Sequence, residues 1–174
     1  MDKRKLSNKI RIVSNRKEAE CCPEKRFRFY KKYASVVSAT LRKPLFQRFL
    51  NWIIIREDIE KKSVKDIQVR VFPYYKENGK ALAGRCNREG VILIFPKRRG
   101  VLRKKARNLG KKNVWFYIKS RARAALIHEV LHLKYEANER KVRKLTRKYC
   151  DMFIDHPNIP SQTMTGFQKS LFTF

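Results

Sequence analysis

Hydrophobic residues in the first third of the chain recur with the period of a helix. After Pro23 they fall at alternating spacings of three and four, at Phe27, Tyr30, Ala34, Val37 and Leu41, which places them on one helical face. Pro44 suits the first turn of a second helix, and large apolar residues dominate residues 45–54. The pattern predicts two helices with buried faces, one beginning near Pro23 and one near Pro44.

After Lys62 the pattern becomes typical of strands. Residues 66–72 alternate polar and apolar side chains, as a half-buried strand does. Residues 91–95 form a continuous apolar run that stops at Pro96, which indicates a buried strand. Between them, Lys80 to Ala83 can pair as a short strand among turns marked by glycines. These segments predict one small three-stranded sheet.

The second half of the chain is expected to supply two more helices. One spans about 114–133 and the other about 139–153, with a turn over 134–138. Residues 1–20 form a basic arm in which only Ile10, Ile12 and Val13 suggest a strand, and residues 154–174 form a tail of different composition. The expected fold class is α+β, with a single domain over residues 21–153 between the arm and the tail.

Charge is the unusual feature of the composition. The 174 residues contain 44 Lys and Arg against 15 Asp and Glu, a formal net charge of +29, while hydrophobic residues make up 43%. A core can therefore form, but self-repulsion favours a polyanionic partner. Nucleic acid is the expected partner, because each cation placed on a phosphate releases counterions. The alternative is a generally basic surface, although such surfaces usually raise Glu along with Lys.

The charge is concentrated in the N-terminal arm and in residues 97–113, which are expected to form a basic loop. No acidic residue occurs from Val91 through Arg123. A solvated loop is the alternative, but a phosphate-tracking arm explains the missing acids better. The residues expected to contact phosphates are Lys3, Arg4, Lys5, Lys97, Arg98, Arg99, Arg103, Lys104, Lys105, Arg107, Lys111 and Lys112.

The cysteines and the apolar runs indicate the compartment. Cys21, Cys22, Cys86 and Cys150 form no metal-type pair and no disulfide-like spacing, so free thiols in a reducing compartment, the cytoplasm or the nucleus, are expected. The longest apolar run near the N-terminus, residues 52–55, falls far short of the roughly 20 residues that a membrane span needs. A cytoplasmic protein without a membrane partner is the expectation.

A His-Glu-x-x-His motif lies in the helix expected over 114–133. His128 and His132 are four residues apart, so both imidazoles can face one zinc ion, and Glu129 can accept a proton from a water on that ion. All other residues from Ala124 to Leu133 are apolar, which predicts burial around the whole helix. The alternative is a pair of core histidines without a metal.

These residues resemble the minimal zincins, the small metallopeptidase domains related to the SprT-like and YgjP-like families. The likeness covers about residues 64–153, and its specific part is the strand from Gly90 to Ile94 together with the helix from Leu126 to Leu133. The resemblance implies a zincin-like α+β fold, one zinc ion on His128 and His132, and Glu129 as the catalytic base.

The third metal ligand is where the chain departs from those families, which place a His soon after the second motif His. Here Glu139 is the first candidate and His156 the second, and a surface Glu paired with a basic residue is the alternative. On an unbroken helix Glu139 would lie about 10 Å along the axis from His132. The helix must therefore break between them, and Asn138 is the residue best suited to cap the next helix.

Two functions remain open. The first is a nucleic-acid-binding protein, with RNA favoured over DNA and association with the ribosome expected, built on a zinc-binding zincin-like scaffold. The alternative is an active zinc metallopeptidase that reaches proteins bound to nucleic acid. The net charge suits both functions, and the missing third-ligand motif favours the first.

Overall fold

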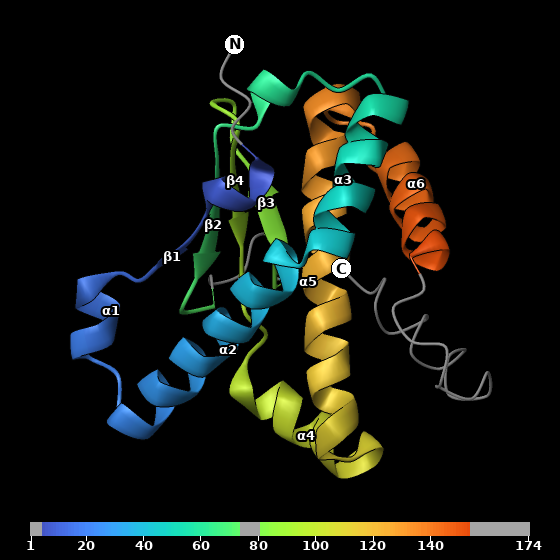
Figure 1. Ribbon diagram of the computed structural model, residues 1–174. Coiled ribbons are helices and arrows are strands. Elements are labelled where there is room, and N and C mark those ends of the chain that lie inside the picture. Colours follow the sequence, from blue (N-terminus) through green and yellow to red (C-terminus); the bar gives the residue numbers. More distant parts are fainter. Residues whose placement is uncertain (1–4, 74–80, 154–174) are drawn as a thin grey trace.

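The computed structural model describes residues 5–73 and 81–153, which form six α-helices and one four-stranded sheet (Figure 1). The helices are α1 (Arg16–Glu20), α2 (Glu24–Arg42), α3 (Pro44–Arg56), α4 (Arg99–Leu109), α5 (Lys111–Tyr135) and α6 (Glu139–Met152). The strands are β1 (Ile10–Val13), β2 (Asp66–Arg70), β3 (Gly84–Cys86) and β4 (Val91–Ile94). The mixed α+β class is confirmed.

The sheet has the order β1-β2-β4-β3, with β1, β2 and β4 parallel and β3 antiparallel to β4 at one edge. The expectation of three strands is wrong, because Ile10 to Val13 pair with Ile67 to Arg70 and add a fourth. The strand expected at Lys80 to Ala83 is also displaced. Its first residue lies outside the described ranges, and the strand itself begins at Gly84, just after Ala83 accepts a hydrogen bond from Phe95.

Helices α2 and α3 follow the predicted apolar stripes. Tyr30, Ala34, Val37 and Leu41 of α2 are buried, and Pro44 occupies the first turn of α3, where its missing N–H costs nothing. Helix α5 contacts α2, α4, α6, β3 and β4, and every residue from Arg121 to Leu131 is buried. This central position confirms the burial predicted for the motif helix.

Two segments expected to be irregular are folded. Residues 97–113 are not a loop, since α4 occupies Arg99–Leu109 and α5 begins at Lys111. Leu102 is only 3% exposed and Ala106, one helical turn later, packs against the core, so a short apolar stripe lies among the basic residues. Within the presumed N-terminal arm, Leu6 and Ile10 are each 1% exposed, because this segment adds a strand to the sheet.

Arg121 shows how the fold accommodates a buried charge. The residue is 4% exposed, and its guanidinium group donates to the carbonyl oxygens of Phe95 at 2.7 Å and Leu82 at 3.2 Å. Hydrogen bonds of this kind offset the cost of removing the charge from water. They fix the end of β4 and the segment before β3 against α5.

Candidate metal centre

The candidate ligands come from both sides of the break between α5 and α6. His128 and His132 lie one turn apart near the end of α5, which stops at Tyr135. Glu136 adopts the left-handed backbone conformation with φ of 41°, and the Asn138 side chain accepts a hydrogen bond from the Lys141 amide. Helix α6 then begins at Glu139. The predicted helix break and the capping role of Asn138 are confirmed.

Three ligand atoms converge at this junction. The distances are 3.1 Å between the Nε2 atoms of His128 and His132, 3.2 Å from His132 Nε2 to Glu139 Oε2, and 3.6 Å from His128 Nε2 to the same oxygen. Tetrahedral zinc about 2.0–2.1 Å from each ligand atom would separate those atoms by roughly 3.3 Å. The three residues can therefore hold a metal ion, and the structure brings together the first-choice ligand set. His156 lies outside the described residues.

Each candidate ligand also has a polar partner outside the ligand set. The Nδ1–H of His132 donates to the Glu136 carbonyl oxygen at 2.5 Å, which leaves its Nε2 lone pair facing His128 and Glu139. His128 Nδ1 lies 3.4 Å from the Thr146 hydroxyl. Arg143 Nε donates to Glu139 Oε1 at 2.5 Å, which leaves Oε2 for the site. Such outer partners orient metal ligands and fix their tautomers.

Burial keeps His128 in the form that binds a metal. The side chain is 7% exposed, and burial lowers its pKa to about 4, with further lowering from His132 and Arg143 and an opposing effect of Glu139. A neutral imidazole presents a lone pair to a cation, whereas a protonated ring cannot. At neutral pH His128 is therefore available as a ligand.

Glu129 lies against strand β3. A Cβ atom added to Gly84 would come within 2.7 Å of Glu129 Cγ and 2.9 Å of its Oε1, so this approach requires glycine. Burial raises the pKa of Glu129 to about 8, the hydrogen bond from the Cys86 amide lowers it, the charge of Glu139 raises it and that of Arg85 lowers it. A cation on the neighbouring ligands would act to lower it.

A cleft of about 1130 Å³ opens over these groups. We call it the metal cleft; the end of α5, all of β3 and the residues Glu136, Ala137 and Glu139 line it. Strand β3 is at the edge of the sheet. Its residues line the same cleft as Glu129 and the three candidate ligands. The cleft therefore combines three side chains that can hold a metal ion, a buried carboxylate and a strand edge.

Sequence reasoning missed several residues of this site. Gly84 was interpreted only as a turn, and nothing in its local pattern indicates that it faces Glu129, 45 positions away. Thr146 likewise has no sequence signal for its contact with His128. Arg143 does, because it lies four residues after Glu139, where an acid and a base on one helix pair.

Of the residues predicted to contact phosphates, those in the described part of 97–112 lie at the other end of α5. Arg98, Arg103, Lys104, Arg107 and Lys112 are exposed, and Lys97, Arg99 and Lys105 are half-buried. From residue 111 to His128 the helix rises about 25 Å. Helix α4 and the junction between α5 and α6 lie at opposite ends of α5 (Figure 1). Lys5 is exposed; Lys3, Arg4 and the Lys111 side chain lie outside the described part.

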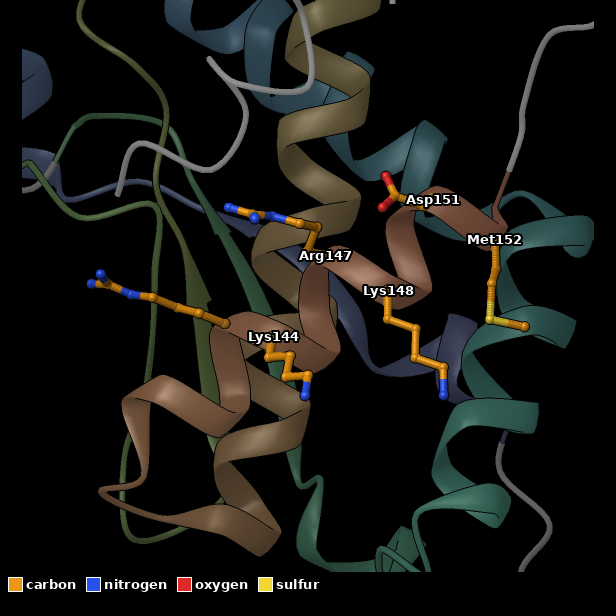
Figure 2. A pocket seen from close by; sticks show the side chains of 6 residues that line it. Lys144, Arg147, Lys148, Asp151 and Met152 are labelled. Carbon is orange, nitrogen blue, oxygen red and sulfur yellow. The ribbon is translucent and has the colours of Figure 1, made fainter. Parts of the chain in front are cut away.

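Helix α6 adds basic residues that the sequence prediction left out. Arg143, Lys144, Arg147 and Lys148 line a shallow pocket of about 740 Å³ together with Asp151 and Met152. Figure 2 shows the side chains of Lys144, Arg147 and Lys148 projecting from α6. The positive surface is therefore wider than the two predicted segments.

No protein-family model, no curated protein and no solved structure matches the chain. The resemblance to minimal zincins therefore rests on the motif residues quoted above. Among the described residues, no helix is both long and apolar enough to cross a membrane.

Proposed function

We propose that the chain is a zinc-dependent peptidase with a zincin-like fold. One observation carries the proposal: two imidazole nitrogens and a carboxylate oxygen converge at 3.1–3.6 Å beside the buried Glu129 carboxylate, in an open cleft. Two His and one Glu, with a fourth position left open, are a ligand set of catalytic zinc. Zinc is proposed as the ion on this basis.

The roles of the residues follow from their positions. His128, His132 and Glu139 hold the ion, which supplies Lewis acidity to the peptide carbonyl and the attacking water. Glu129 takes a proton from that water as its oxygen bonds to the carbonyl carbon, and gives the proton to the amine nitrogen as the C–N bond breaks. The edge of β3 can pair with an extended substrate.

The test compares Glu129→Gln with Glu136→Gln. Both residues line the metal cleft, but only Glu129 is the proposed base. Wild type should contain about one zinc per chain and cleave unfolded protein substrates. Glu129→Gln should keep the zinc and lose cleavage, whereas Glu136→Gln should keep both. Persistent cleavage by Glu129→Gln would contradict the mechanism. If wild-type protein refolded in the presence of zinc contained no zinc, His128 and His132 would be core histidines without a metal.

Nucleic-acid binding is a second proposed function, with RNA favoured over DNA and the ribosome as one candidate partner. The supporting observation is the group of exposed cations on and around α4, about 25 Å along α5 from His128. RNA held there leaves the metal cleft open, so a peptidase could act on proteins bound to the same nucleic acid. The four cysteines are free, in keeping with the proposed cytoplasmic location.

The salt dependence of RNA affinity tests this second function. Each phosphate neutralised should contribute roughly 0.7–0.9 to the slope of log affinity against log salt. Contacts from several elements predict a steep slope. A slope magnitude below about 2 would contradict binding by more than a few phosphates.

A further inference from the structure

A second cavity lies between α1, α2 and α4, formed by residues outside the metal cleft. Its volume is about 760 Å³, within the range of about 300–1,000 Å³ typical of small-molecule sites. We call it the α1–α4 pocket. Neither the peptidase nor the general attraction of α4 for phosphates accounts for a cavity at this position.

The α1–α4 pocket is lined by both cationic and aromatic side chains. Four cationic residues from three helices line it: Lys17 of α1, Arg26 of α2, and Arg98 and Arg99 at the start of α4. Glu18 is the one acid among its lining residues. The aromatic side chains of Tyr30 and Phe72 also line it, with ring centroids 5.8 Å apart. The pocket therefore suits a ligand with one anionic part and one apolar part.

The start of α4 adds backbone donors to this pocket. No side chain among the described residues caps α4. The Arg99 amide donates to the Tyr30 hydroxyl oxygen at 3.0 Å, and the next two residues, Gly100 and Val101, line the pocket. First-turn amides are donors without partners inside their own helix, and they suit a phosphate group. Val101 is 41% exposed, an apolar surface that a bound ligand could cover.

We propose that the α1–α4 pocket binds one nucleotide unit of a nucleic-acid strand. The phosphate contacts the cations and the first turn of α4, and the base lies against Phe72 and Val101. A bare phosphate would leave that apolar surface uncovered, whereas a base stacks well on aromatic side chains. This inference rests on the proposed nucleic-acid-binding function and assigns it a specific site.

The experiment measures binding of adenosine monophosphate, adenosine and inorganic phosphate to the full chain. Adenosine monophosphate should bind at least about tenfold more tightly than either fragment, since hydrogen bonds to charged groups contribute roughly such a factor each. The variant Lys17→Gln/Arg26→Gln should lose about tenfold or more of this affinity. The matched control Arg16→Gln/Lys25→Gln removes two exposed cations from the same helices but none from the pocket, and should bind like wild type.

Three results would overturn the proposal. Equal losses in the two double variants would indicate unspecific attraction, and equal affinity for phosphate and the nucleotide would exclude base recognition. Binding of anionic phosphatidylserine vesicles, weakened by Lys17→Gln/Arg26→Gln without any nucleotide binding, would assign the pocket to lipid headgroups.

A competition experiment identifies the source of the nucleotide. A single-stranded oligoribonucleotide should displace adenosine monophosphate from the wild-type chain. Simultaneous binding of both would assign the pocket to free nucleotides and overturn the inference. If RNA affinity depends steeply on salt but no nucleotide binds, only the assignment of the α1–α4 pocket is refuted. If RNA affinity does not depend on salt, the proposed nucleic-acid-binding function itself is refuted.

Discussion

The two ends of α5 lie in opposite environments, one buried in the core and one next to exposed basic residues. Towards its C-terminus, every residue from Arg121 to Leu131 is buried, including His128 and Glu129. Towards its N-terminus the helix meets α4, where most basic side chains are exposed. A metal site needs ligands fixed by packing and second partners, whereas phosphate binding needs cations that reach solvent. The comparison suggests two functions that can be separated by mutation.

The largest expected effect is on the buried end of α5. His132→Ala removes one of three ligands and should abolish stoichiometric zinc binding, measured by metal analysis of the purified protein. It should also lower stability, because the remaining buried polar groups lose the ion. The slope of RNA affinity against salt should not change. A change in that slope would show that the two ends of α5 are coupled.

Glu139→Gln tests the third ligand by itself. It keeps the shape of the side chain but removes the anionic oxygen that lies 3.2 Å from His132 Nε2. Zinc affinity should fall by about 100-fold or more, beyond the 10–100-fold typical of losing an outer partner. Unchanged affinity would exclude Glu139 and leave His156 as the remaining candidate.

The next prediction concerns the basic end. Replacing Arg103, Lys104, Lys105 and Arg107 with Ala keeps good helix formers in α4. The salt slope should fall by about 3–4 and affinity should drop uniformly across RNA sequences, because phosphate contacts carry no sequence information. The control replaces Arg48, Lys61, Lys62 and Lys65, all exposed and outside the α4 region. Loss confined to one RNA sequence would indicate base recognition instead.

Gly84 provides a further test, because Gly84→Ala should affect catalysis without affecting metal binding. Gly84→Ala places a methyl group 2.7 Å from Glu129 Cγ and should cost about 1–3 kcal/mol in the free energy of unfolding. Cleavage should fall while zinc content stays the same. The control is Gly100→Ala, where a Cβ meets nothing within 4 Å; there stability should rise by about 0.5–1 kcal/mol. Full cleavage by Gly84→Ala would argue against Glu129 as the base.

The smallest effect is expected at Glu57, which joins α3 to α5 and α6. Burial raises its pKa, but hydrogen bonds from the Tyr135 and Tyr149 hydroxyls and the charges of Lys134 and Lys141 outweigh this, so the pKa lies below 4.5. The folded state therefore gains stability from Glu57 above pH 4.5 and loses it as the pH falls through the lowered pKa. The urea midpoint of wild type should exceed that of Glu57→Gln at pH 7, and the difference should shrink below pH 4.5. A constant difference would contradict this linkage.

Local patterns predicted the candidate site better than the fold around it. His128 and His132 share a helical face by spacing alone, and Asn138 marks the break that admits Glu139. The pairing of Ile10 with Ile67 and the approach of Gly84 to Glu129 join distant segments, so their local sequence carries little sign of them. In α4 the density of basic residues concealed the short stripe formed by Leu102 and Ala106.

The compact spacing of the candidate ligands has a consequence for the order in which the protein matures. His128, His132 and Glu139 lie within residues 128–139, and joining segments this close along the chain costs little loop-closure entropy. A chain whose α5 and α6 have formed can thus capture an ion before the sheet is complete. The Glu129 side chain reaches its buried environment only when β3, with Gly84, packs against α5. In the proposed peptidase, ion binding therefore depends on α5 and α6 alone, whereas the surroundings of Glu129 also require β3.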